Sequence, residues 1–158
     1  MEPVCAWRSQ RIREGDTHVS TGRPFISTQF VHFDLVDLLG VVHNAQYFFL
    51  FERARTDWIQ SHGLWYGSPE FDWPYYVVRN EIDYLAPIFG GVEIDVSVQI
   101  DKIGRTSATF HHLIATPDGQ KAAEGRTIVV RVDPDSKIPI PWTDRFRRLA
   151  ESIKRDDP

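Results

Sequence analysis

The sequence predicts an α+β fold in which an antiparallel sheet wraps around one long central helix. The stretch 44–63 carries apolar side chains nearly all round its early turns, which is typical of a helix surrounded by protein. Segments with the composition of strands follow it, joined by short turns that contain glycine or proline. Strands connected by such turns pair antiparallel, so one sheet around one helix is the expected arrangement.

The composition is that of a single folded domain. The chain has 158 residues, of which 42% are hydrophobic, and a formal net charge of -4 gives no electrostatic footprint for nucleic acid. The single cysteine, Cys5, excludes an intrachain disulfide and favours the reducing cytoplasm. No run reaches the ~18 apolar residues that a membrane-spanning helix needs, so we expect no membrane insertion.

Three regions follow from the pattern along the chain. Residues 1–24 mix charge, glycine and proline without a period and are interpreted as an N-terminal extension. Residues 25–142 contain the periodic segments and form the predicted domain, which begins with a strand at 25–33. Residues 143–158 are interpreted as a charged C-terminal tail or short helix.

The helix after the first strand has the clearest signal. Tyr47, Phe51, Ala54 and Trp58 recur at helical spacing and lie on one face. Asn44 is a plausible N-cap, and Gly63 a plausible stop.

The remaining strands are predicted at 75–85, 92–100, 106–115 and 121–132, paired in chain order as a meander. Residues 92–100 alternate apolar and polar side chains, the period of a half-buried strand. The segment 63–74 between helix and strands is an aromatic loop. Such a sheet leaves an edge uncovered, and dimerisation is the ordinary remedy, so we expect a homodimer or a dimer of dimers.

Several motifs occur in order along the chain and carry a family resemblance. They are Phe33, Asp37, Gly40, Val42 and Tyr47, then Phe51-Glu52-Arg53-Ala54-Arg55, Ile82-Asp83-Tyr84-Leu85-Ala86-Pro87, Gly104-Arg105-Thr106-Ser107 and Val132-Asp133-Pro134. Together, over about residues 25–141, they resemble the hotdog-fold acyl-CoA thioesterases, in the branch of 4-hydroxybenzoyl-CoA thioesterase and the acyl-CoA thioesterases of the Tol-Pal gene cluster. The resemblance implies a hotdog fold and hydrolysis of an acyl-CoA thioester without a cofactor of its own.

Two positions depart from that family. Leu35 stands where the family often has a further acidic residue, and His43-Asn44 replaces a Tyr-His pair. Asp37 still matches the catalytic aspartate of the family.

Within the stretch 37–47, three residues are candidates for the chemistry. Asp37 would act as general base on water, or as nucleophile through a mixed anhydride. The backbone amide of Asn44, in the first turn of the helix, would donate to the oxyanion of the tetrahedral intermediate. His43 is a minor catalytic candidate. The alternative interpretation of Asp37 is a turn cap before Gly40, and that of Asn44 is an N-cap.

A second hotdog branch carries its catalytic carboxylate on the central helix, which makes Glu52 a rival to Asp37. We prefer for Glu52 an ion pair with Arg53 or Arg55. The histidines offer no convincing zinc spacing, since His111 and His112 are adjacent and would face opposite sides of a strand.

Coenzyme A phosphates would contact a basic turn between strands, a role that the resemblance implies for Lys102, Arg105, Thr106 and Ser107. Two alternatives to acyl-CoA hydrolysis stay open. One is release of an acyl chain from an acyl carrier protein, and the other is a non-catalytic acyl-CoA-binding module. The sequence leaves open the acyl group and the choice between dimer and tetramer.

Overall fold

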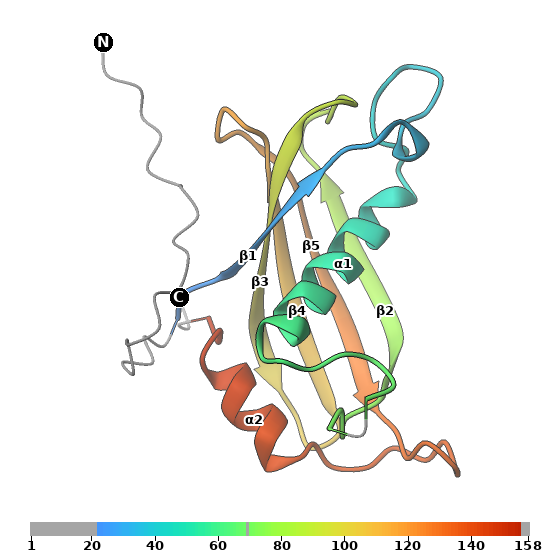
Figure 1. The fold of residues 1–158 in the computed structure, drawn as a ribbon, viewed down its shortest axis with the longest axis vertical. Coiled ribbons are helices and arrows are strands. Elements are labelled where there is room, and N and C mark those ends of the chain that lie inside the picture. Colours follow the sequence, from blue (N-terminus) through green and yellow to red (C-terminus); the bar gives the residue numbers. More distant parts are fainter. Residues whose placement is uncertain (1–21, 69, 156–158) are drawn as a thin grey trace.

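The computed structural model describes residues 22–68 and 70–155, and it has a five-stranded sheet with one long helix along one face (Figure 1). The predicted extension 1–24 and Cys5 lie almost wholly outside the described residues. The elements are β1 (Phe25–Phe30), the short 3-10 helix η1 (Phe33–Leu35), α1 (Gln46–Ser61), β2 (Tyr75–Tyr84), β3 (Glu93–Ile103), β4 (Ser107–Ala115), β5 (Lys121–Arg131) and α2 (Asp144–Glu151). The α+β prediction is therefore confirmed. No described helix is long and apolar enough to span a bilayer.

The sheet has the strand order β1-β3-β4-β5-β2, and every neighbouring pair is antiparallel. The predicted four-strand meander is wrong at its first connection, because β2 pairs with β5 rather than with β3. Residues 85–92 instead carry the chain from β2 to the other side of the sheet, where β3 pairs with β1. Local turn signals could not reveal this, since they do not encode a crossover to the other edge of the sheet.

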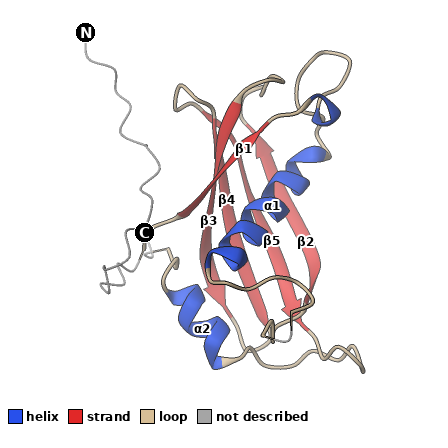
Figure 2. Cartoon of the chain, in the orientation of Figure 1, coloured by secondary structure: helices blue, strands red, loops and turns tan. Residues whose placement is uncertain are grey.

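The core lies between α1 and the sheet (Figure 2). Phe51, Ala54 and Trp58 are buried on the sheet-facing side of α1, as the helical spacing predicted. The side chains of β3 that alternate inward are also buried, namely Ile94, Val96, Val98 and Ile100. Each buried aliphatic or aromatic side chain contributes roughly 1.5–3 kcal/mol, so this interface supplies most of the driving force for folding.

The ends of α1 differ in part from the prediction. Its N-cap is Ala45, not Asn44, and no side chain of the cap residue accepts a hydrogen bond there. At the other end, Gly63 has a φ of 70°, which glycine adopts at little cost. The predicted stop is confirmed.

The C-terminal region contains α2, which packs on the lower end of the core. Thr143 caps it, its hydroxyl accepting from the Phe146 N–H at 3.1 Å. Phe146 is fully buried and stacks on Trp142, with 3.9 Å between ring centroids. Ala150 and Ile153 enter the core as well, so a charged segment is anchored by three apolar side chains.

Gly125 of β5 lets α1 lie close to the sheet because it has no side chain, and a substitution at this position tests the packing. An added Cβ would lie 2.6 Å from the Glu81 backbone oxygen and 2.7 Å from the Phe51 ring. We expect Gly125→Ala to lower the free energy of unfolding by about 1–3 kcal/mol through overpacking. Urea unfolding measures the change. A second mutation, Phe51→Leu, removes one of the two clashes, so the double variant should lose less free energy of unfolding than the two single variants lose in sum. Strictly additive losses would contradict the proposed contact.

Candidate functional site

The stretch around Asp37 is a tight, hydrogen-bonded loop before α1. The Asp37 N–H donates to the Val41 carbonyl at 2.9 Å, and the Gly40 N–H donates to the Asp37 carbonyl at 3.0 Å. Gly40 has a φ of 74°, a backbone conformation that a residue with a Cβ rarely adopts. The sequence therefore needs glycine here to reverse the chain within a few residues.

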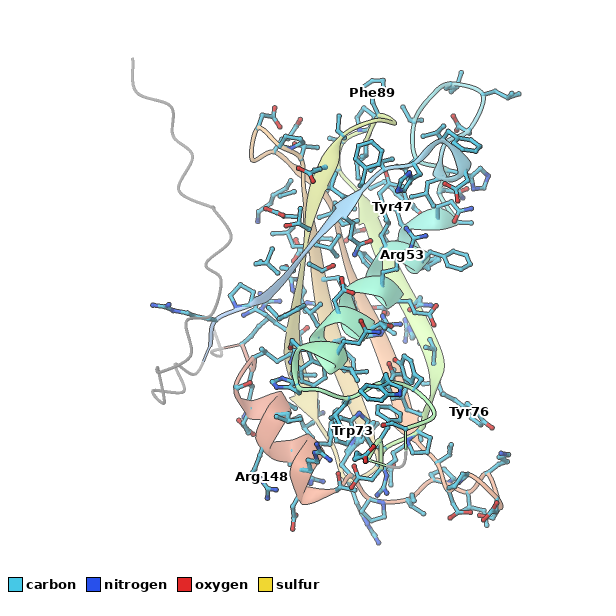
Figure 3. All side chains as sticks on the ribbon, in the orientation of Figure 1. Tyr47, Arg53, Trp73, Tyr76, Phe89 and Arg148 are labelled. Carbon is cyan, nitrogen blue, oxygen red and sulfur yellow. The ribbon has the colours of Figure 1, made fainter. Side chains whose placement is uncertain are left out.

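The loop is tied to the segment that connects β2 with β3. The Val42 N–H donates to the Ile88 carbonyl at 2.8 Å, and the Gly90 N–H donates to the Gly40 carbonyl at 3.2 Å. In Figure 3, Phe89 of this segment lies at the same end of the molecule as Tyr47 of α1. These bonds fix the position of Asp37 relative to the start of α1.

The Asp37 carboxylate is half-buried and only partly engaged. Its Oδ1 accepts from the Leu39 N–H at 2.8 Å, the turn interaction that the alternative interpretation required. No further hydrogen bond or ion pair of the carboxylate occurs in the described part of the chain. One carboxylate oxygen orients the group, and the other can accept a proton.

The start of α1 presents the Asn44 backbone to solvent. Across residues 22–68 and 70–155, the Asn44 N–H finds no acceptor, whereas its carbonyl accepts from the Tyr84 hydroxyl at 3.0 Å. The Tyr84 ring packs edge-on against Tyr47, with 5.0 Å between centroids, and burial, followed by the nearby Tyr84, raises the pKa of Tyr47. A free amide at a helix start is a donor for negative charge.

His43 is exposed, and its ring accepts a hydrogen bond from the backbone. Nδ1 accepts from the Ala45 N–H at 3.2 Å, so the neutral ring carries its proton on Nε2. The His43 side chain thus accepts from a free N–H at the start of α1, the interaction predicted for the Asn44 side chain.

Glu52 is exposed on α1, and the predicted ion pair is wrong for the residues that the structure describes. Neither Arg53 nor Arg55 pairs with it. Arg55 instead points under the helix, toward the sheet.

The four residues expected at a coenzyme A site lie elsewhere. Lys102 is the second-last residue of β3, Arg105 and Thr106 lie in the turn, and Ser107 begins β4. The Arg147 side chain donates to the Arg105 carbonyl in this turn at 3.3 Å. Asp37 lies near the other end of β3, about 30 Å away along a strand that rises roughly 3.3 Å per residue. One chain brings Asp37, His43 and Asn44 together but does not bring the basic turn to them.

A buried polar cluster beneath α1 was missed from the sequence. Arg55 is only 4% exposed, and its Nη1 contacts Nε2 of His112 at 3.3 Å and donates to the Thr127 hydroxyl at 3.1 Å. The His112 ring stacks on Phe51, with 4.5 Å between centroids. The signal was present, because Arg55 follows Phe51 by one helical turn and so falls on the buried face.

His111 and His112 face opposite sides of the sheet, as predicted. His111 Nε2 lies 2.6 Å from a Glu124 carboxylate oxygen, and this hydrogen bond lowers the pKa of Glu124. Among the described residues, no three histidine, cysteine, aspartate or glutamate side chains are grouped to hold a metal ion.

Comparison with known proteins gives a consistent result. The model of the thioesterase-like superfamily matches residues 31–150. The acyl-CoA thioester hydrolase YbgC of Escherichia coli is 29% identical over 105 residues, which cover 66% of this chain and 78% of that protein.

Solved structures agree in fold. A Thermus thermophilus thioesterase complexed with coenzyme A and zinc is 30% identical, with a TM-score of 0.69, over 82% of this chain and 92% of that one. A 1,4-dihydroxy-2-naphthoyl-CoA thioesterase from Synechocystis is 20% identical with a TM-score of 0.72, over 81% and 96% of the two chains, and shows the fold alone.

The buried histidine predicts a pH dependence of stability. Burial, followed by the nearby Arg55 charge, holds the pKa of His112 well below its ordinary value. Below about pH 6.5, His112 therefore binds a proton in the unfolded chain but stays neutral in the folded chain. The free energy of unfolding accordingly falls as the pH falls.

Between about pH 7.5 and 5.5 we expect His112 to cost about 1 kcal/mol in the free energy of unfolding. Urea unfolding at both pH values, for the wild type and His112→Gln, measures this contribution as the difference between the two proteins. Equal pH dependence in both would show that His112 is protonated in the fold.

Proposed function

Because the chain belongs to the thioesterase-like superfamily, we propose that it hydrolyses acyl-CoA thioesters to the free acid and coenzyme A. The observation that carries the proposal is the short loop that joins a half-engaged carboxylate, Asp37, to a free helix-start amide, Asn44. Relatives named acyl-CoA thioester hydrolase, and a relative complexed with coenzyme A, support the thiol as coenzyme A.

In the proposed reaction the thioester oxygen faces the Asn44 N–H. As general base, Asp37 takes a proton from water while the water oxygen bonds to the thioester carbon. The negative charge that develops on the carbonyl oxygen is stabilised by the amide, and the C–S bond then breaks to release coenzyme A thiolate, which takes up a proton. As nucleophile, Asp37 would instead form a mixed anhydride that water hydrolyses.

Coenzyme A anchoring requires a second subunit in this proposal. Lys102 and Arg105 are exposed cations at the far end of the sheet, too distant to serve the Asp37 of their own chain. In an antiparallel homodimer the partner would bring this turn toward Asp37, where guanidinium and ammonium groups suit phosphate.

The edge strand β2 is the surface proposed for this dimer. Among the described strands it pairs with β5 alone, and its apolar side chains Tyr76 and Val78 are half-exposed or more. Long edges with apolar side chains are normally covered by a further strand. The resulting site would draw on both subunits.

Replacing the carboxylate tests the chemistry. We expect Asp37→Asn to lower turnover by roughly 10²–10³ or more on a panel of aliphatic and aromatic acyl-CoAs, because the amide can neither accept the proton nor attack. Release of free thiol measures the rate. Asp34→Asn is the matched control, since Asp34 is an exposed carboxylate in the same loop region.

Wild-type turnover by Asp37→Asn would reject the assignment. Faster hydrolysis of matched acyl-carrier thioesters than of acyl-CoAs would favour a carrier protein as the thiol source. Tight acyl-CoA binding without hydrolysis of any substrate would favour a binding module.

A charge on the edge strand tests the dimer. We expect Val78→Lys to shift the protein toward monomer in analytical ultracentrifugation, because a lysine on an edge opposes strand pairing. Turnover should fall with it, since the partner's basic turn is lost. Ile26→Lys, on the opposite edge strand β1, should keep the wild-type mass. A wild-type monomer, or dissociation by the control alone, would contradict the β2 interface.

A further inference from the structure

Arg55 is a buried cation without an anion. Its described hydrogen-bond contacts are with the neutral groups of His112 and Thr127, both through Nη1, and its Nε is buried without an acceptor. Its guanidinium carbon also lies over the Phe110 ring, 5.9 Å from the centroid, a contact that offers no anion. No ion pair of Arg55 occurs within residues 22–68 and 70–155. An unpaired buried charge is strongly unfavourable, so a group from outside the chain is expected to approach it.

Carboxylates on the neighbouring elements are directed elsewhere. The Asp57 carboxylate accepts from the Ser27 hydroxyl, on the β1 side of α1. Glu81 and Asp83 of β2 pair in register with Arg126 and Glu124, on the sheet face away from the helix. The anion that Arg55 lacks is therefore absent from its own surroundings.

An uncovered surface runs beside Arg55, on the helix-facing side of β2. We call it the β2 strip, and it consists of Tyr75, Val77, Asn80, Ile82 and Tyr84. Ile82 pairs with Gly125, which touches Phe51, and Asn80 pairs with Thr127, which touches Arg55.

Although these side chains face the layer of α1, the helix leaves Val77, Asn80 and Tyr84 exposed, whereas Tyr75 and Ile82 are partly buried against the core. Tyr84 is 49% exposed and Val77 is 44% exposed. The strip is largely apolar, and its middle residue, Asn80, is an exposed amide.

The strip connects the candidate site with Arg55. At one end the Tyr84 hydroxyl donates to the Asn44 carbonyl. Asn80, opposite the Thr127 that contacts Arg55, lies about 13 Å further along β2 at roughly 3.3 Å per residue. Along α1, Arg55 lies about 16 Å from Asn44 at ~1.5 Å per residue. The two routes agree, so both put the cation at a similar distance from the thioester position.

We propose that the β2 strip binds the acyl chain and that Arg55, assisted by Asn80, binds a carboxylate at the far end of that chain. The preferred substrates are then CoA thioesters of long-chain dicarboxylic acids, esterified to the thiol through one carboxyl group. This inference rests on the proposed thioesterase function. A terminal carboxylate at the end of a chain fits better than a bulkier partner side chain, because Arg55 lies beneath the helix and is only 4% exposed.

Matched pairs of CoA thioesters test the inference. Each pair has a monocarboxylic and a dicarboxylic acyl group of equal length, and the lengths run from short to long. We expect the wild type to prefer the dicarboxylic member by roughly 10- to 100-fold in kcat/KM once the chain spans the strip, because a charge-assisted hydrogen bond to a desolvated cation is strong. Short pairs should show no such preference.

Two variants act on the cation by different routes. Arg55→Met removes it, and Asn80→Asp puts a competing carboxylate beside it at an exposed position that folding tolerates. Both should reduce the dicarboxylic preference at least tenfold. Asn80→Asp should also raise the thermal midpoint, because it pairs the buried charge. Arg53→Met, on the exposed face of α1, should keep the wild-type preference.

The outcomes separate this inference from the proposed function. Hydrolysis without a dicarboxylic preference at any length, or a preference that survives both variants, overturns the role of Arg55 and leaves the thioesterase intact. Calorimetry with the Asp37→Asn protein and the same pairs of thioesters measures binding separately from hydrolysis. Binding that prefers the dicarboxylic member and is lost in the Asn80→Asp background, without turnover by the wild type, rejects the thioesterase and supports the anion site.

Discussion

The packing of α1 against a sheet wider than itself is the constraint on which the rest of the structure depends. The backbone of the helix lies toward β1 and β3, and its side chains Phe51 and Trp58 reach β4, where they pack on His112 and Phe110. Gly125 allows this close approach, since any side chain there would meet Phe51. The edge strand β2, beyond this contact, keeps exposed residues on its helix-facing side, so the packing that forms the core also leaves the β2 strip.

This packing also decides where the free polar groups lie. A helix start exposes amides that have no intrahelical partner, and here the loop 37–43 and Tyr84 hold that start in place. The Asp37 carboxylate reaches the same region through a loop whose backbone is hydrogen-bonded at both ends. In the proposed reaction, a carboxylate and an amide held in this way would need little reorganisation, which is the condition for electrostatic stabilisation of a transition state.

The sequence predicted the parts of the fold that depend on local period. The spacing of Tyr47, Phe51, Ala54 and Trp58 gave α1, and the alternation at 92–100 gave β3. Strand order was not accessible, because the pairing of β2 with β5 depends on a crossover that short-range turn signals do not encode. Asp37, His43 and Asn44 were brought together by their closeness in sequence, whereas the separation of Lys102 and Arg105 from them follows from the length of β3.

Arg55 shows why the remainder escaped prediction. Helical spacing alone places it on the buried face, but the ordinary expectation for arginine is a nearby carboxylate, and Glu52 was the obvious partner. In the structure Glu52 lies in solvent and Arg55 lies among neutral groups. The buried charge of Arg55 therefore lacks the opposite charge that a folded core normally provides. The free Asn44 amide and the guanidinium without an anion are the same kind of observation: each is a donor that finds no such partner within residues 22–68 and 70–155. Because the β2 strip runs from the Asn44 amide to the Arg55 guanidinium, one elongated ligand with an acceptor at each end would satisfy both donors. The distance between the two donors then sets the length of the acyl chain that fits.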